Sequence, residues 1–150
     1  GTLHRVALVK HPRTDATLGL TYRVGREWPG AAAPALEALE ARRSIFLVGP
    51  QGVGKTTILR EASRVLSDLG RRVVVVDTAG EIAGGDPVPH KAIGALARRV
   101  WVGRRPEQHQ VVLEAVQNFA PEAVVIDELA TRQDVRAVAA AARQGVAVVA

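Results

Sequence analysis

Several residue types that shape folding are missing from this chain. It contains no cysteine, which excludes a disulfide framework and a thiolate zinc site and is compatible with a reducing compartment. It contains no methionine and starts at Gly1, so we interpret it as a piece of a longer protein. At 150 residues, the piece is long enough to bury the core of one domain without covalent cross-links.

Long apolar runs and aromatic residues are also scarce. No stretch approaches the roughly 18 consecutive apolar residues of a membrane span, and the first residues lack the layout of a signal peptide. We therefore expect no transmembrane segment and a cytoplasmic location. Aromatic residues make up 3% of the chain, too few to form a platform on which single-stranded nucleic acid stacks.

The charge is shifted to the basic side. Lysine and arginine total 20 and aspartate and glutamate 15, for a formal net charge of +5. Arginine pairs carry much of the excess: Arg42/Arg43, Arg71/Arg72, Arg98/Arg99 and Arg104/Arg105. Such a balance suits a polyanionic partner, but arginine also solubilises helix ends. Both interpretations stay open, and we expect any nucleic acid to bind mainly through regions outside this chain.

Short apolar strands alternate with helical patterns along the chain. Residues 1–30 contain two strand-like runs, 4–10 and 18–24, which predict a β-hairpin. Four further apolar runs predict buried strands: 44–48, 72–77, 122–127 and 146–150. Helical patterns lie at 34–43, 58–69, 90–100, 106–119 and 131–144. Residues 31–150 are therefore expected to form an α/β core domain, with a parallel sheet covered by helices on both faces.

The most specific motif is "GPQGVGKTT" at residues 49–57. It fits the phosphate-binding pattern G-x-x-x-x-G-K-[ST] and stands between an expected strand and an expected helix, as that pattern requires. Its glycines let backbone N–H groups curl around phosphates at a helix N-terminus. Lys55 would reach the terminal phosphates, and the Thr56 hydroxyl would coordinate Mg²⁺. The expected nucleotide-binding residues are Gly49, Pro50, Gln51, Gly52, Val53, Gly54, Lys55, Thr56 and Thr57.

A second motif, which is acidic, follows another buried strand. In "AVVIDE", Asp127 would order the Mg²⁺ shell and Glu128 would polarise the attacking water. The pair points to the ATPase branch of P-loop NTPases with an additional strand and the sheet order 5-1-4-3-2. Residues 146–150 would be strand four, and strand five would follow Ala150. The chain holds no N-K-x-D quartet of the guanine-specific type, so ATP with Mg²⁺ is the expected ligand.

Five blocks together resemble a known family over about residues 18–150. They are "LGLTYRVGR", "GPQGVGKTTILREASRVL", "RRVVVVDTAGEIAGGDPVPHKAIG", "QHQVVLEAVQNFAPEAVVIDEL" and "GVAVVA". The chain resembles the stage III sporulation protein AA family, including cyanobacterial and plastid relatives with a downstream Arg-xxx-His nucleic-acid-binding module. The resemblance implies a RecA-like, AAA-type ATPase related to the motors of type II and type IV secretion. It also implies a homo-oligomeric ring, such as a hexamer, and a location in the plastid stroma for the plastid branch.

The resemblance adds a second candidate for activating water. In the related motors, the strand after the phosphate-loop helix ends in an Asp, and a short loop then carries a catalytic Glu. Asp77 and Glu81 of "DTAGE" fall on those positions. Catalysis is thus expected from Lys55 together with Glu128 or Glu81, and adjacency to Asp127 favours Glu128.

Two further features bear on turnover. Ring ATPases need positive charge from a neighbouring subunit, for which Arg23, Arg26 and the pairs Arg98/Arg99 and Arg104/Arg105 are candidates; the alternative is that they form surface ion pairs. Family members continue past the fourth strand into a Thr-Ala-His-Gly-like segment that senses the γ-phosphate.

The first functional hypothesis is an ATP-hydrolysing motor for secretion-type assembly or for nucleic acid. The second is a nucleotide-dependent binding switch with little turnover.

Overall fold

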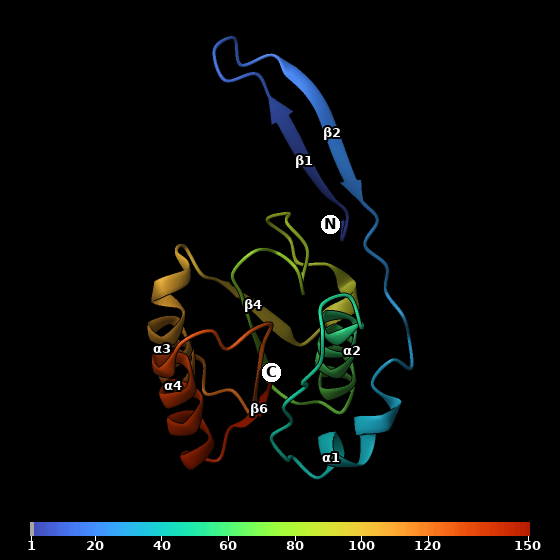
Figure 1. Ribbon diagram of the computed structural model, residues 1–150. Coiled ribbons are helices and arrows are strands. Elements are labelled where there is room, and N and C mark those ends of the chain that lie inside the picture. The colour runs from blue at the N-terminus through green and yellow to red at the C-terminus, as the bar shows by residue number, and fades with distance from the viewer. Residues whose placement is uncertain (1) are drawn as a thin grey trace.

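The N-terminal hairpin stands away from the rest of the molecule in the computed structural model, which describes residues 2–150 (Figure 1). Strand β1 (Arg5–Lys10) pairs antiparallel with β2 (Thr17–Arg23), which confirms the expected hairpin. Val6 lies opposite Tyr22 and is 56% exposed. Because a two-stranded ribbon has no second layer to bury its apolar side chains, it is a weak structural unit by itself.

A four-stranded parallel sheet forms the centre of the body. Its strands are β3 (Val73–Asp77), β4 (Ala97–Trp101), β5 (Ala123–Ile126) and β6 (Ala147–Val149). Their order across the sheet is β4-β3-β5-β6, and every pairing is parallel. The expected strands at 72–77, 122–127 and 146–150 are therefore present, and they lie next to one another in the expected order across the sheet.

The expected strand at 44–48 is present only in reduced form. Ile45 makes a single parallel bridge to Val149 of β6. Its amide donates to Val148 O at 2.7 Å, and its carbonyl accepts from the amide of Ala150 at 3.0 Å. No described residue pairs with the outer edge of this segment, where Val48 is 96% exposed. The segment therefore occupies the expected place beside β6 without the second neighbour that would extend the ladder.

The prediction of a helix at 90–100 is wrong. Residues Lys91–Ile93 form one 3₁₀ turn, and Ala97–Trp101 form β4 at the edge of the sheet. Gly94 separates them with a φ of 96°, which a continuing helix does not allow. A side chain at this position would also collide with Ser67, because an added Cβ would lie 2.3 Å from the Cβ of that residue.

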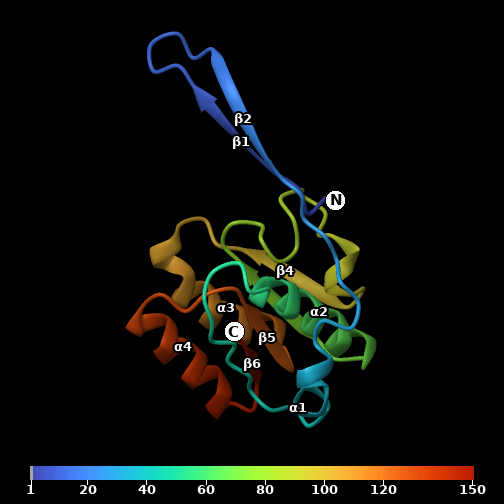
Figure 2. The ribbon, with the colours of Figure 1, turned by 45° about the vertical axis from the view of Figure 1, so that its right-hand side comes forward.

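The helices cover both faces of the sheet, as predicted. Their bounds are α1 (Leu36–Glu40), α2 (Lys55–Asp68), α3 (Gln108–Phe119) and α4 (Arg132–Arg143). Helices α1 and α2 lie on one side and α3 and α4 on the other (Figures 1 and 2). Leu59 of α2 packs with Val75, and Val112 of α3 packs with Val74, because neighbouring strand residues face opposite sides. None of the described helices has the length and apolar character needed to cross a membrane.

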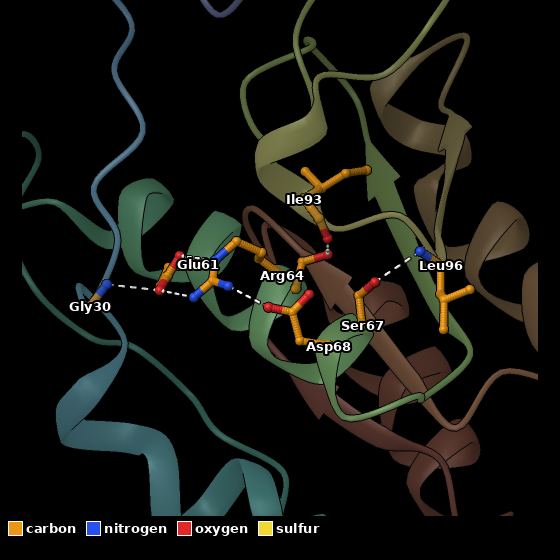
Figure 3. A network of polar contacts seen from close by, with 8 residues as sticks. Gly30, Glu61, Arg64, Ser67, Asp68, Ile93 and Leu96 are labelled. Carbon is orange, nitrogen blue, oxygen red and sulfur yellow. Dashed lines mark hydrogen bonds and ion pairs between the residues drawn. The ribbon is translucent and has the colours of Figure 1, made fainter.

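Helix α2 also carries polar anchors for its neighbours (Figure 3). The Glu61 carboxylate accepts from the amide of Gly30 at 2.8 Å and pairs with Arg64 of the next turn. The Ser67 hydroxyl accepts from the amide of Leu96 at 2.8 Å, and Ser63 donates to Ile93 O at 2.8 Å. These contacts hold both the linker after the hairpin and the turn before β4 against one helix.

Candidate functional site

A cleft of ≈ 870 Å³ opens where the sheet strands end. Such crevices at the carboxyl ends of parallel strands are the usual ligand sites of open α/β sheets. The cleft brings together most of the residues singled out in the sequence: Gln51, Gly52, Gly54, Lys55, Thr56, Thr57, Glu81, Asp127 and Glu128. Gly49, Pro50 and Val53 do not line it, and Val53 is 61% exposed. Arg23, the last residue of β2, and Val24, which follows it, complete the wall.

The loop of residues 49–54, which we name the phosphate loop after the sequence pattern that it matches, leads directly into α2. Gly52 and Gly54 have φ values of 77° and 103°, a left-handed region that favours glycine. Gly54 caps the helix without any side-chain hydrogen bond to the first turn, so no capping side chain competes for these N–H groups. The local backbone thus presents donors and the positive end of the helix dipole to the cleft.

The Lys55 ammonium lies inside the curl of this loop. Its Nζ donates to Gly49 O at 2.7 Å and to Pro50 O at 2.8 Å. Both acceptors are neutral carbonyls, so an anionic phosphate oxygen in the cleft would be a stronger partner for the same group. The carbonyls of the loop therefore hold the lysine at the cleft.

Thr56 and Asp127 connect the phosphate loop with the second acidic motif. The Thr56 hydroxyl donates to Asp127 Oδ1 at 2.9 Å, across 71 residues of sequence. Burial raises the pKa of the Asp127 carboxyl to about 6, the hydrogen bond from Thr56 opposes this rise, and the carboxylates of Glu81 and Asp77 add to it. The Asp127 carboxyl thus lies in a largely buried place, with the carboxylates of Glu81 and Asp77 close to it.

This donor set fits Mg²⁺. A hydroxyl and a carboxylate are oxygen ligands, and Mg²⁺ in nucleotide sites usually takes one or two protein oxygens together with phosphate and water. No cluster of three or more His, Asp or Glu side chains suited to a metal occurs among residues 2–150. Thr56 and Asp127 could therefore hold the ion only together with other oxygen ligands, such as those of a bound nucleotide.

Glu81 is held from several directions. Asp77 is fully buried, and its carboxylate accepts from the amides of Glu81 at 3.0 Å and Ala83 at 2.9 Å. The Arg60 guanidinium donates to Glu81 O at 2.6 Å and to Ile82 O at 2.7 Å. The Glu81 carboxylate forms an ion pair with Arg5 of the hairpin and also lies beside Asp127. Its position in the cleft is thus set by groups from four parts of the chain.

Sequence reasoning missed Arg60 as a part of this site. Arg60 is only 7% exposed, and burial lowers the pKa of its guanidinium. In the sequence it looks like an ordinary polar residue of an amphipathic helix, because nothing local indicates that its donors reach a loop 21 residues further on. No sequence signal could have identified this contact.

Glu128 has a different environment. Its carboxylate forms an ion pair with Arg105, with Nη2 and Oε2 3.0 Å apart, and its side chain is 65% exposed. Its backbone carbonyl accepts from Gln108 Nε2 at 2.8 Å, and Gln108 Oε1 accepts from the Thr78 hydroxyl at 2.8 Å. Gln108, which sequence reasoning also missed, is 1% exposed and ties the loop after β3 to the loop after β5.

Most of the candidate trans-acting arginines already have partners within the chain. Arg99 donates to the carbonyls of Gly84, Asp86 and Pro87 at 2.6–2.8 Å. Arg98 lies over the Phe119 ring, 4.8 Å from its centroid. Arg104 pairs with Glu107 and Arg105 with Glu128. Arg23 instead borders the cleft of its own chain.

The comparisons with known proteins agree with the resemblance seen in the sequence. A family described as "Sporulation stage III, protein AA" matches residues 16–150. The "Uncharacterized protein ycf45" of Porphyra purpurea is 46% identical over 149 residues, which are 99% of this chain and 26% of that protein. The "Protein SEEDLING PLASTID DEVELOPMENT 1" of Arabidopsis thaliana is 43% identical over 150 residues, 99% of this chain and 22% of that protein.

A more distant relative comes from a bacterium. The "Stage III sporulation protein AA" of Bacillus subtilis (strain 168) is 29% identical over 136 residues, which are 85% of this chain and 43% of that protein. The chain thus spans a quarter or less of the plastid-development protein and less than half of the sporulation protein. Because the family matches nearly the whole length of the chain, the chain belongs to the family of sporulation stage III protein AA.

Proposed function

We propose that this chain is the ATP-binding and ATP-hydrolysing part of its protein, with Mg²⁺ as cofactor. The observation that carries the proposal is the hydrogen bond between Thr56 and Asp127 at 2.9 Å. It joins a phosphate-binding loop to an acid at the end of a second buried strand, beside a lysine and two glutamates in the same cleft. This is the combination that hydrolysis of a nucleoside triphosphate requires.

The chain's own residues would each have a defined task. Lys55 would exchange the carbonyls of Gly49 and Pro50 for phosphate oxygens, and the N–H groups of residues 52–57 would bind the remaining oxygens. Thr56 and Asp127 would hold the ion, which neutralises charge that develops on the phosphates. A glutamate would accept a proton as the water oxygen bonds to the γ-phosphorus. The bond to the β–γ bridging oxygen then breaks, and ADP leaves with that electron pair.

Two glutamates compete for the role of base. Sequence adjacency to Asp127 favours Glu128, but in the structure the Glu128 carboxylate turns to Arg105 and is largely exposed. Glu81 lies beside Asp127, and its backbone is fixed by Asp77 and Arg60. We therefore propose Glu81 as the first candidate and Glu128 as the second. Single-turnover hydrolysis by Glu81→Gln and Glu128→Gln decides between them, because only the loss of the true base removes the chemical step.

The broader assignment rests on the sheet and on the family. Segment 44–48 lies beside β6, followed by β5 and β3, and this order supports a RecA-like ATPase of the additional-strand type. We propose a homo-oligomeric ring, such as a hexamer, that serves secretion-type assembly or acts on nucleic acid. The name of the Arabidopsis relative refers to plastid development, which supports the plastid stroma as an alternative to the cytoplasm.

A switch with little turnover is the second candidate function. One observation favours it: both candidate bases are engaged by arginines, Glu81 by Arg5 and Glu128 by Arg105. A carboxylate oxygen that accepts from an arginine N–H is occupied and less free to orient a water molecule. In that case the chain would bind ATP tightly and hydrolyse it slowly.

One experiment separates these outcomes. Binding of ATP and release of phosphate are measured with Mg²⁺ for the unmodified chain and for Lys55→Ala, at several protein concentrations. Binding and turnover that both depend on Lys55, with turnover rising steeply with concentration, support the ring ATPase. Binding without turnover supports the switch, and equal binding by the two proteins refutes both.

A further inference from the structure

The base of the hairpin reaches the cleft through two arginines. Arg5 of β1 and Arg23 of β2 are direct cross-strand partners in the hairpin register, so their side chains leave the ribbon on the same face. Like charges placed opposite one another are unfavourable in an isolated ribbon. Here they face anionic surroundings, because Arg5 pairs with Glu81 and Arg23 lines the cleft that also contains Asp127 and Glu128.

The remainder of the hairpin has little hold on the body. All residues of β1 are exposed, and β2 has only one half-buried residue, Gly19. Besides the Arg5 pair, the amide of Thr2 donates to the Asp86 carboxylate at 2.6 Å. These two contacts end on the loop that follows β3, whereas the segment after β2 is held to α2 by Arg60, which donates to Arg26 O at 3.1 Å. The hairpin is therefore tied to the same loop that presents Glu81.

The side chain of Glu81 differs from its backbone in what holds it. The backbone is bound by Asp77 and Arg60, which belong to the core. The carboxylate is bound by Arg5, which belongs to the hairpin. A displacement of the hairpin would thus free the carboxylate while leaving the loop in place.

We propose that the hairpin regulates the nucleotide site through Arg5, which engages the Glu81 carboxylate and restrains its reaction with water. The inference rests on the proposed ATPase function and adds its regulation. Arg5 is a positioning residue in this scheme, because it acts on Glu81 rather than on the nucleotide. A movement of the hairpin away from the body would release Glu81 and raise turnover.

The test compares Arg5→Ala with Arg13→Ala, which removes an exposed arginine from the turn of the same hairpin. Arg5→Ala should raise kcat about two- to fivefold, the range expected for the loss of a partly exposed ion pair, and leave the KM for ATP unchanged. Arg5→Lys should keep most of the restraint, and Arg13→Ala should behave like the unmodified chain. In a Glu81→Gln background, Arg5→Ala should have no further effect on kcat.

Three results overturn the inference: equal kcat for Arg5→Ala and Arg13→Ala, a lower kcat for Arg5→Ala, or an increase that persists when Glu81 is glutamine. Lys55→Ala supplies the background rate. If the unmodified chain, Arg5→Ala and Lys55→Ala all release phosphate equally, the proposed function fails. If the first two exceed Lys55→Ala and equal one another, only the regulatory inference fails.

Discussion

The two loops that border the cleft are held in opposite ways. The phosphate loop, residues 49–54, is closed by its own neighbour, because Lys55 donates to two carbonyls of that loop. The loop at 78–90 depends on side chains outside it: Arg60 and Arg99 from other elements, and the buried Asp77 at the end of β3. A self-contained loop appears in the sequence as a motif, whereas a loop held from outside does not.

The largest expected effect concerns the phosphate loop. Lys55→Ala removes the ammonium that binds the terminal phosphates, so ATP affinity should fall by about a hundredfold or more, since hydrogen bonds to charged groups contribute roughly 1.5–3 kcal/mol each. The midpoint of thermal unfolding should change little, because the lysine contacts only its own loop. Isothermal titration and a melting curve check the two statements. A strong loss of stability would show that this loop is not self-contained.

The second largest effect is expected on stability, at the loop of residues 78–90. Arg60→Leu leaves the carbonyls of Glu81 and Ile82 without their donor in a buried place, which should lower the free energy of unfolding by about 2–4 kcal/mol. Urea denaturation measures the change. Arg136→Leu is the matched control, since this arginine is exposed on a helix, and it should stay within about 0.5 kcal/mol. Equal losses of unfolding free energy for the two variants would show that Arg60 does not hold this loop.

Asp127 lies where the two loops meet and should show a pH-dependent effect of intermediate size. Its pKa in the folded chain is about 6, above the ordinary value of 3.8, so below pH 4 the folded and unfolded chains are both protonated. As pH rises from about 4 to about 6, the folded chain binds more protons than the unfolded chain, so stability falls over this range. Asp127→Asn should therefore stabilise the nucleotide-free chain by about 1–2 kcal/mol at pH 8, with the gain fading towards pH 4.

Urea unfolding at several pH values tests this prediction. The same variant should also lose the Mg²⁺ dependence of ATP binding, because the amide oxygen is a poorer ligand for the ion. A destabilised variant at pH 8 would show that the Asp127 carboxylate is well compensated in the folded chain.

The smallest effect concerns the far half of the 78–90 loop. Arg99→Lys keeps the charge, but an ammonium cannot reproduce the fork of a guanidinium that reaches three carbonyls. Stability should fall by about 1 kcal/mol, and hydrogen exchange of the amides of residues 84–86 should become faster. Unchanged exchange would mean that Arg99 does not hold this half of the loop.

The elements that were correctly predicted from the sequence are, like the phosphate loop, those encoded by a local pattern. The spacing of apolar residues and the residues that begin and end each element predicted the hairpin, the three long helices and the strands at 72–77, 122–127 and 146–150. The helix expected at 90–100 was wrong, because the free edge of β3 recruits residues 97–101 into the sheet and the serines of α2 bind the turn before them. Such pairing depends on partners 24 or more residues away along the chain.

By itself, the sequence determined the phosphate loop and the acid at the end of β5, since both are encoded by residues within a few positions of one another. It also indicated Glu81, through its resemblance to a family rather than through its spacing. How Glu81 is held becomes visible only in the folded chain, where Arg60 binds its backbone carbonyl and Arg5 its carboxylate. The physical reason is that buried hydrogen-bond partners are chosen by proximity in the folded chain, and a local pattern carries no record of them.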